Sequence, residues 1–220
     1  MTRVTVEAVE GVAVLRFLHP ILTLEVLAAA TGSVKSLGNP SALVVTSEHP
    51  RIFLAGAHLG EIAGLDHASS RGYAEEGRRF LGALLALPAP TVAAVHGACA
   101  GGGLDLALAC DWITAGPQAR FGHPGIRRGL VTGWGGTSLL PERIGRRRAL
   151  ALLAEARLIP AGEAVRIGLA DEIQDEPSAS ARRRALALAD LHPRRLALWR
   201  AARSGGFVDI FAGNVVHTRR

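Results

Sequence analysis

The chain has 220 residues, 49% of them hydrophobic, which is long enough for one large domain with a sizeable core. No apolar stretch reaches the roughly 18 residues that a membrane-spanning helix needs, and the N-terminal residues do not resemble a signal peptide. The two cysteines, Cys99 and Cys110, exclude a disulfide framework and suit a reducing compartment. We therefore expect a cytoplasmic protein without a membrane partner.

The formal net charge of +6 comes almost wholly from arginine, since Lys35 is the only lysine. Long basic tracts, zinc-ligand spacings and the aromatic content that stacks on bases are all missing, so nucleic acid is not an expected partner. An anionic small molecule would account for the charge, and so would a solvated basic surface.

The first ninety residues predict strands and helices in alternation. Residues 3–17 alternate between apolar and polar types and predict a β-hairpin. Residues 41–50 form a β-branched run that predicts a buried strand, and residues 51–62 predict another strand and then the start of a helix. Residues 71–87 place large apolar side chains near one face, which indicates an amphipathic helix.

The middle of the chain continues this alternation. Residues 91–97 predict a buried strand, and residues 104–110 are apolar except for Asp105, as expected of a core helix. Residues 111–125 predict two short strands with turns after each. The segment 133–158 predicts two helices in succession.

The last part of the chain changes character. A helix is predicted up to Gly168, and after Gln174 a polar stretch leads into a helical segment that ends near Asp190. Residues 193–220 are weakly patterned. We therefore place a soft boundary between a core of residues 1–175 and a C-terminal region of residues 176–220, in a chain of the α/β class.

A glycine triplet, Gly101 to Gly103, stands immediately before the predicted core helix. The first N–H groups of a helix have no acceptors within it, and glycine lets a ligand approach them closely. These amides could therefore stabilise negative charge on a substrate oxygen, where one donor contributes about 3–4 kcal/mol in a transition state. The alternative is a tight turn that packs the core helix closely.

A second loop of small residues, "FLAGAHLGEI", also follows a predicted strand and also holds a glycine, Gly56. Two such loops can offer backbone amides to one carbonyl oxygen from two sides. A thioester carbonyl that becomes an enolate needs this arrangement.

These two motifs carry a family resemblance. The segment "SEHPRIFLAGAHLGEI" resembles the first signature of the crotonase superfamily, the enoyl-CoA hydratase/isomerase family. The segment from "TVAAVHGACAGGGLDLALACD" to "GLADEI" is similar to the core of that family. The resemblance covers roughly residues 3–175, and the order and spacing of the two loops make it specific.

The resemblance implies a spiral of ββα repeats, a homo-oligomer (a trimer or a dimer of trimers) and an acyl-CoA thioester as substrate. No cofactor is implied, because coenzyme A enters as part of the substrate. By motif position, the backbone amides of Ala57 and Gly102 would hold the thioester oxygen. The remaining residues that would line the substrate site are Ala55, Gly56, His58, Leu59, Gly101 and Gly125.

The two catalytic glutamates that the resemblance implies for hydratases are not both present. The first position holds Asp105, which keeps a carboxylate with a side chain shorter by one methylene group. The second position, in "FGHPG", holds Gly125, so the second carboxylate is absent and space is expected beside it. Asp105 could be catalytic, or it could only stabilise the first turn of its helix.

Two histidines could supplement the single carboxylate. His58 stands where the family usually has an aspartate, and it could act as an acid, bind a CoA phosphate or simply cap a turn. His123 is expected on a strand, on the same side as Gly125, where it could take over acid–base work. No histidine pair with a carboxylate appears at metal-ligand spacing, so no metal site is expected.

Three functions remain open from the sequence. The first is an enoyl-CoA hydratase, which adds water to a 2-enoyl-CoA. The second is a related enzyme with one carboxylate, acting as an isomerase, a decarboxylase or a catalyst that forms or cleaves C–C bonds. The third is an acyl-CoA-binding oligomeric protein with little or no activity. The C-terminal helical region, residues 176–220, is shorter than the resemblance leads us to expect, which affects how the acyl pocket is covered.

Overall fold

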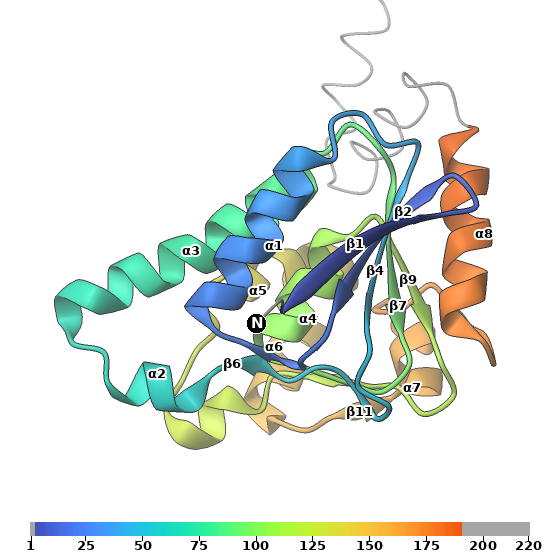
Figure 1. The fold of residues 1–220 in the computed structure, drawn as a ribbon. Helices are drawn as coiled ribbons and strands as arrows, with labels where there is room; N and C mark the ends of the chain where they lie inside the picture. The colour runs from blue at the N-terminus through green and yellow to red at the C-terminus, as the bar shows by residue number, and fades with distance from the viewer. Residues whose placement is uncertain (1–2, 191–220) are drawn as a thin grey trace, which may run out of the picture.

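Three successive strand–strand–helix units build the core of the computed structural model, which describes residues 3–190 (Figure 1). In each unit the first strand joins a large sheet, the second joins a small sheet, and a helix follows. The units are β4 (Leu43–Ser47), β5 (Ile52–Leu54) and α3 (His67–Leu85); β7 (Thr91–Val95), β8 (Ala98–Ala100) and α4 (Gly102–Ala109); and β9 (Trp112–Ala115), β10 (Arg120–Gly122) and α5 (Gly136–Ile144). The expected α/β class and ββα spiral are confirmed.

The large sheet has six strands in the order β1-β2-β4-β7-β9-β12. β1 (Val4–Val9) and β2 (Val12–Phe17) form the predicted antiparallel hairpin, whose turn holds Glu10 and Gly11 at positive φ. The remaining neighbours are parallel, out to the edge strand β12 (Glu172–Ile173). β4 and β7 are buried along their whole length, as expected for parallel strands covered on both faces.

The small sheet has the order β11-β10-β8-β5. β5, β8 and β10 run parallel, and β11 (Ile159–Pro160) pairs antiparallel with β10. A separate parallel pair joins β3 (Ile21–Leu22) to β6 (Gly56–Ala57), the short strand that follows β5.

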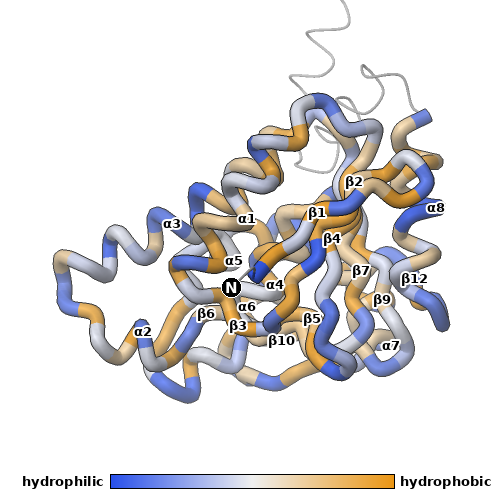
Figure 2. The backbone as a smooth tube through the Cα atoms, in the orientation of Figure 1, coloured by the Kyte–Doolittle hydropathy of each residue, from blue (hydrophilic) through white to orange (hydrophobic). Residues whose placement is uncertain are grey.

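Helices cover both faces of the large sheet (Figure 1). α1 (Leu24–Ser36) and α3 pack against each other on one side, while α8 (Pro177–Ala189) packs against β4, β7 and β9 on the other. Figure 2 shows the hydrophobic segments gathered along the strands and α4, between these helices. The interior therefore consists of one core under α1 and α3 and a smaller one under α8.

The shorter helices of residues 3–190 are α2 (Leu59–Ala63), the 3-10 helix η1 (Pro124–Arg128), α6 (Arg146–Glu155) and α7 (Ala161–Arg166). The sequence analysis assigned no element to α1, which begins at the cap residue Thr23. The predicted start of α3, at residue 71, was also too late, because Asp66 and Ser69 form a capping box and the helix begins at His67. Within residues 3–190, no helix is long and apolar enough to cross a membrane.

The C-terminal region is described only as far as α8, so residues 193–220, predicted to be weakly patterned, lie outside the described residues. α8 is held to the large sheet by Glu172 as well as by apolar packing. Glu172 accepts hydrogen bonds from Trp112 Nε1 (3.1 Å), Thr114 Oγ1 (2.9 Å) and Arg184 (3.1 Å). The Arg184 guanidinium also lies 4.3 Å from the centroid of the Trp112 ring.

Replacing Glu172 with glutamine should therefore destabilise the fold. The change removes the charge that faces Arg184, and we expect a loss of about 1–3 kcal/mol in the free energy of unfolding. Chemical denaturation at neutral pH measures this loss. The matched control is E75Q on the exposed surface of α3, which should change stability by less than about 0.5 kcal/mol.

The same carboxylate predicts a pH dependence. Burial acts to raise the pKa of Glu172, but the hydrogen bonds from Arg184 and Thr114 and the Arg184 charge outweigh it, so the pKa lies below 4.5. Because the pKa of Glu172 is lowered by folding, the stabilisation is present at neutral pH and is lost as the pH falls through the pKa of the folded state. The stability difference between wild type and E172Q should therefore shrink in acid, and a difference that is constant between pH 7 and pH 3 would contradict this assignment.

Candidate active site

The site is assembled from three loops that leave the same edge of the small sheet. β5, β8 and β10 are parallel neighbours, with Leu54 and Phe121 both in register with Cys99. Their C-terminal ends therefore lie side by side, and a loop follows each of them. The amide of Gly101 donates to the carbonyl of Gly122 (3.0 Å), which ties the second loop to the third.

The first two loops are in direct contact, as the sequence analysis expected. Gly56 has a φ of +95°, and a Cβ atom added to it would lie 2.9 Å from the backbone nitrogen of Gly102. The same atom would lie 2.8 Å from the carbonyl oxygen of Ala100. Only glycine permits this approach, so Ala57 and Gly102 stand on adjoining stretches of backbone.

Each glycine of the triplet has its own steric reason. Gly101 caps α4 with a φ of +53°. A Cβ atom on Gly102 would lie 2.1 Å from the indole of Trp134, and one on Gly103 would lie 2.3 Å from the carbonyl oxygen of Leu54. The close-packing explanation is therefore correct, and this packing brings the N-terminus of α4, with the amide of Gly102, against the Gly56 loop.

The residues that flank Gly56 present an open face. Ala55, His58 and Leu59 are exposed, whereas Gly56 is buried and Ala57 half-buried. His58 is the N-cap of α2, and its Nδ1 accepts a hydrogen bond from the amide of Glu61 (3.1 Å). Of the three roles considered for His58, capping is the one that the structure describes directly.

Asp105 lies in the first turn of α4 and is completely buried. Its Oδ2 accepts a hydrogen bond from the hydroxyl of Thr132, and its Oδ1 lies 3.2 Å from Nε2 of His123. A Cβ atom on Gly136, the first residue of α5, would lie 2.1 Å from Oδ1. The carboxylate therefore faces the N-terminus of α5, the positive end of the helix dipole.

His123 is 5% exposed and belongs to the third loop, not to a strand as predicted. β10 ends at Gly122, and Pro124 begins the 3-10 helix η1, so His123 becomes its N-cap. This geometry turns the imidazole onto Asp105. Apart from that contact, neither Nε2 of His123 nor Oδ1 of Asp105 has a hydrogen-bond partner within the described residues.

Gly125 differs from expectation in the same way. It lies inside η1, and its carbonyl accepts from the amide of Leu130 (3.0 Å). A Cβ atom added to Gly125 would lie 3.0 Å from the carbonyl oxygen of Leu130. The carbonyl of Leu130 therefore narrows the space on the Cβ side of Gly125, because the turn closes on itself.

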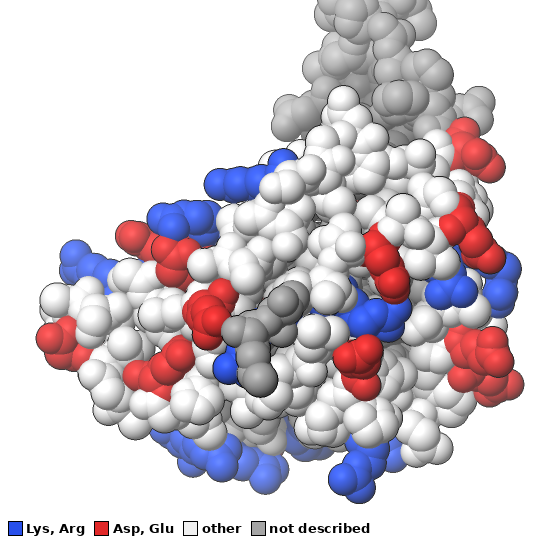
Figure 3. Space-filling view, in the orientation of Figure 1, with Lys and Arg blue, Asp and Glu red and all other residues white. Residues whose placement is uncertain are grey.

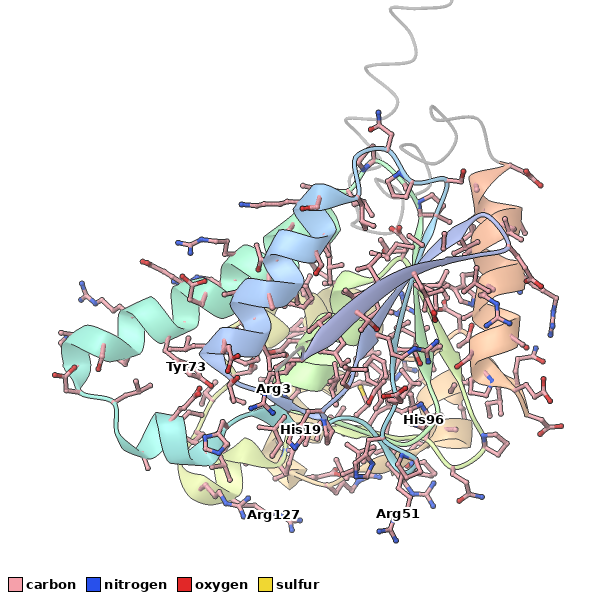
Figure 4. The ribbon with its side chains drawn as sticks, in the orientation of Figure 1. Arg3, His19, Arg51, Tyr73, His96 and Arg127 are labelled. Atoms are coloured by element: carbon pink, nitrogen blue, oxygen red, sulfur yellow. The ribbon has the colours of Figure 1, made fainter. Side chains whose placement is uncertain are left out.

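Sequence reasoning missed the aromatic pair that covers these loops. The Trp134 indole is buried against the Cα atoms of Gly77 and Gly102, and its ring centroid is 5.9 Å from that of Tyr73. Figure 4 shows Tyr73 between α3 and α2. Burial, with a contribution from the charge of Glu61, raises the pKa of Tyr73 to about 12, so its hydroxyl is neutral at physiological pH.

The thiol of Cys99, which lies near Asp105, is unsuited to catalysis. Cys99 is buried beneath α4, and burial, together with the negative charge of Asp105, raises the pKa of its thiol well above the ordinary value. Within residues 3–190, no three metal-ligating side chains gather at one point. Asp105 and His123 are thus the acid–base groups that the loops bring together.

Basic side chains gather along the lower edge of the face in Figure 3. Figure 4 places Arg51 and Arg127 along that edge, pointing outward. Arg127 belongs to η1, next to the third loop of the site. Arg127 therefore places a positive charge beside the site loops, whereas Arg51 precedes β5 and lies at the opposite end of that strand.

Comparison with known proteins identifies close relatives over most of the chain. Methylglutaconyl-CoA hydratase of Mus musculus, named as mitochondrial, is 36% identical over 168 residues, covering 76% of this chain. The human protein of the same name is 35% identical over the same length. The aligned part is 54% of the mouse protein and 50% of the human one, so the chain spans about half the length of the curated relatives it matches.

Solved structures agree with this relationship. An enoyl-CoA hydratase from Bacillus anthracis superimposes with a TM-score of 0.88 at 28% identity, covering 99% of this chain and 89% of that one. DspI of Pseudomonas aeruginosa superimposes with a TM-score of 0.83 at 29% identity, covering 96% of each chain. The model of the enoyl-CoA hydratase/isomerase family matches residues 7–201. With that match over most of its length, the chain belongs to the enoyl-CoA hydratase/isomerase family.

Proposed function

We propose that the protein is an enoyl-CoA hydratase, which adds water to the double bond of a 2-enoyl-CoA. The observation that carries this proposal is the buried pair of Asp105 and His123, 3.2 Å apart, beside two adjoining amide loops. Family membership and the names of its relatives support the reaction class.

The amide loops would stabilise the enolate. The thioester oxygen would accept hydrogen bonds from the amides of Ala57 and Gly102, which stand on neighbouring backbone at the head of α4. The partial positive charge of the α4 N-terminus adds to this stabilisation. As the β-carbon accepts an oxygen, the charge that develops on the thioester oxygen is held by these donors.

Asp105 and His123 would act as one acid–base unit. The unit takes a proton from water while the water oxygen bonds to the β-carbon, and it returns a proton to the α-carbon as the enolate collapses to the saturated thioester. The carboxylate, held by Thr132, would stabilise the imidazolium formed in between. A histidine thereby replaces the second carboxylate that Gly125 cannot provide.

Double-bond isomerisation is the second candidate, and one observation favours it. Asp105 is completely buried, and the second carboxylate position holds Gly125, which has no side chain to hold a water molecule. A single acid–base unit can move a proton between the two ends of an allylic system without any water. The amide loops would serve both reactions equally.

Further aspects of the proposal rest on the family and on composition. We place the protein in the cytoplasm because its two buried free cysteines suit a reducing compartment. We propose a homo-oligomer, a trimer or a dimer of trimers, and the exposed apolar side chains of Ile126, Val131 and Leu150 are candidates for its contacts. No cofactor besides the CoA of the substrate is proposed, and the basic lower edge suits its phosphates.

An assay with crotonyl-CoA tests the main proposal. Hydration removes the conjugated double bond, so the absorbance of the enoyl thioester should fall, and 3-hydroxybutyryl-CoA should appear by mass spectrometry. If crotonyl-CoA is unchanged while a 3-enoyl-CoA is converted to the conjugated isomer, the isomerase is correct. Saturable binding without any turnover would contradict both reactions.

Substitution of the acid–base pair tests the mechanism. D105N and H123N should each lower kcat by about 100-fold or more, because general acid–base catalysis contributes on that scale. The double variant should be no slower than the slower single variant, since the two groups act as a unit. Full activity in H123N would show that the imidazole takes no part in the mechanism. A loss of kcat in the double variant equal to the product of the two single losses would show that the groups act independently.

A further inference from the structure

We propose that Trp134, backed by Tyr73, is the residue that limits the acyl group to a short chain. The inference deepens the proposed function and rests on it, because it assumes that an acyl-CoA binds between the two amide loops. It assigns a specificity role to an aromatic pair that acid–base chemistry does not use.

The position of the pair follows from two glycines. A Cβ atom on Gly77 of α3 or on Gly102 of α4 would lie 2.1 Å from the Trp134 ring, so the indole rests on both backbones. Gly102 is also the residue whose amide would hold the thioester oxygen. An acyl chain that leaves this carbonyl along the α3 side of α4 therefore meets the indole within a few bonds.

Tyr73 closes the other side. Its ring centroid lies 5.9 Å from that of Trp134, and its buried hydroxyl lies next to the backbone of His58, in the first loop. Trp134 thus covers the loop of Gly102, and Tyr73 reaches the loop that contains Ala57. Together the two rings bridge both amide loops and form a wall across the space between α3 and α4.

The wall is rigid enough to exclude a long chain. Trp134 is 5% exposed and Tyr73 is 6% exposed, and both belong to the main hydrophobic core. Moving the indole aside would require α3 and α4 to separate, since it lies against the backbone of each. Short acyl groups fit in front of such a wall, whereas long ones must displace it.

Binding of saturated acyl-CoA thioesters tests the proposal without any turnover. Calorimetry with butyryl-CoA and decanoyl-CoA should show that the wild type gains no affinity from the longer chain. An open apolar pocket would instead add affinity with each buried methylene group. In W134A, decanoyl-CoA should gain at least about tenfold in affinity relative to butyryl-CoA, because the space left by the indole accepts the chain.

The matched control is W112A, which removes the same side chain at the large sheet, on the side of α8. It should keep the wild-type ratio of affinities. If W134A does not fold, W134F serves as the second variant, with a smaller shift in the same direction. A wild type that prefers decanoyl-CoA tenfold, an unchanged ratio in the Trp134 variants, or an equal shift in W112A would overturn the proposal.

The outcomes separate this inference from the proposed function. If binding follows the expected chain-length pattern but no enoyl-CoA is turned over, the role of Trp134 is supported and the proposed activity is contradicted. If enoyl-CoA thioesters are turned over at rates independent of chain length, the proposed activity is supported and the role of Trp134 is contradicted. A wild type that binds neither thioester would overturn both.

Discussion

The parallel register of β5, β8 and β10 is the constraint on which the site depends. Because Leu54, Cys99 and Phe121 lie across from one another, the three loops that follow these strands begin at one level. The strands are only three residues long, so the register rests as much on close backbone contacts as on ladder hydrogen bonds. The contact of Gly56 with Gly102 and the bond from Gly101 to Gly122 hold the loops together.

The environment of Asp105 explains why an aspartate can stand there. A buried carboxylate is costly unless hydrogen bonds and charge compensate for its lost solvation. Here the Thr132 hydroxyl and the N-terminus of α5 supply that compensation. A Cβ atom on Gly136 would lie 2.1 Å from Oδ1, so a side chain at position 136 would collide with the carboxylate. The short carboxylate and its neighbours therefore fit one another sterically as well as electrostatically.

Local patterns in the sequence predicted the longer strands and the two small-residue loops, since these depend on alternation, β-branching and glycine, while the ββα order came from the family resemblance. The contact of His123 with Asp105 depends instead on sheet register, which relates residues distant in the chain and leaves no local pattern. The prediction of a strand through His123 failed because Pro124 cannot continue the strand and instead begins a 3-10 helix. The Trp134 contact was equally hidden, although Gly77 and Gly102, placed in helices where glycine is unfavourable, were its available signals.

The sequence left two explanations open for the glycine triplet, close packing of the core helix and presentation of backbone amides, and the structure is consistent with both. Close packing and amide presentation are alternatives only if the packing covers the amides. In this fold the Cα of Gly102 faces Trp134 while its nitrogen faces the Gly56 loop, so one residue presents different sides to the indole and to the neighbouring loop. A side chain at Gly102 would push away the indole, and a side chain at Gly103 would push away Leu54, the last residue of β5, which leads into the Gly56 loop. Packing on one side of the helix terminus therefore fixes the position of the donors on the other, and the core and the site cannot be altered independently.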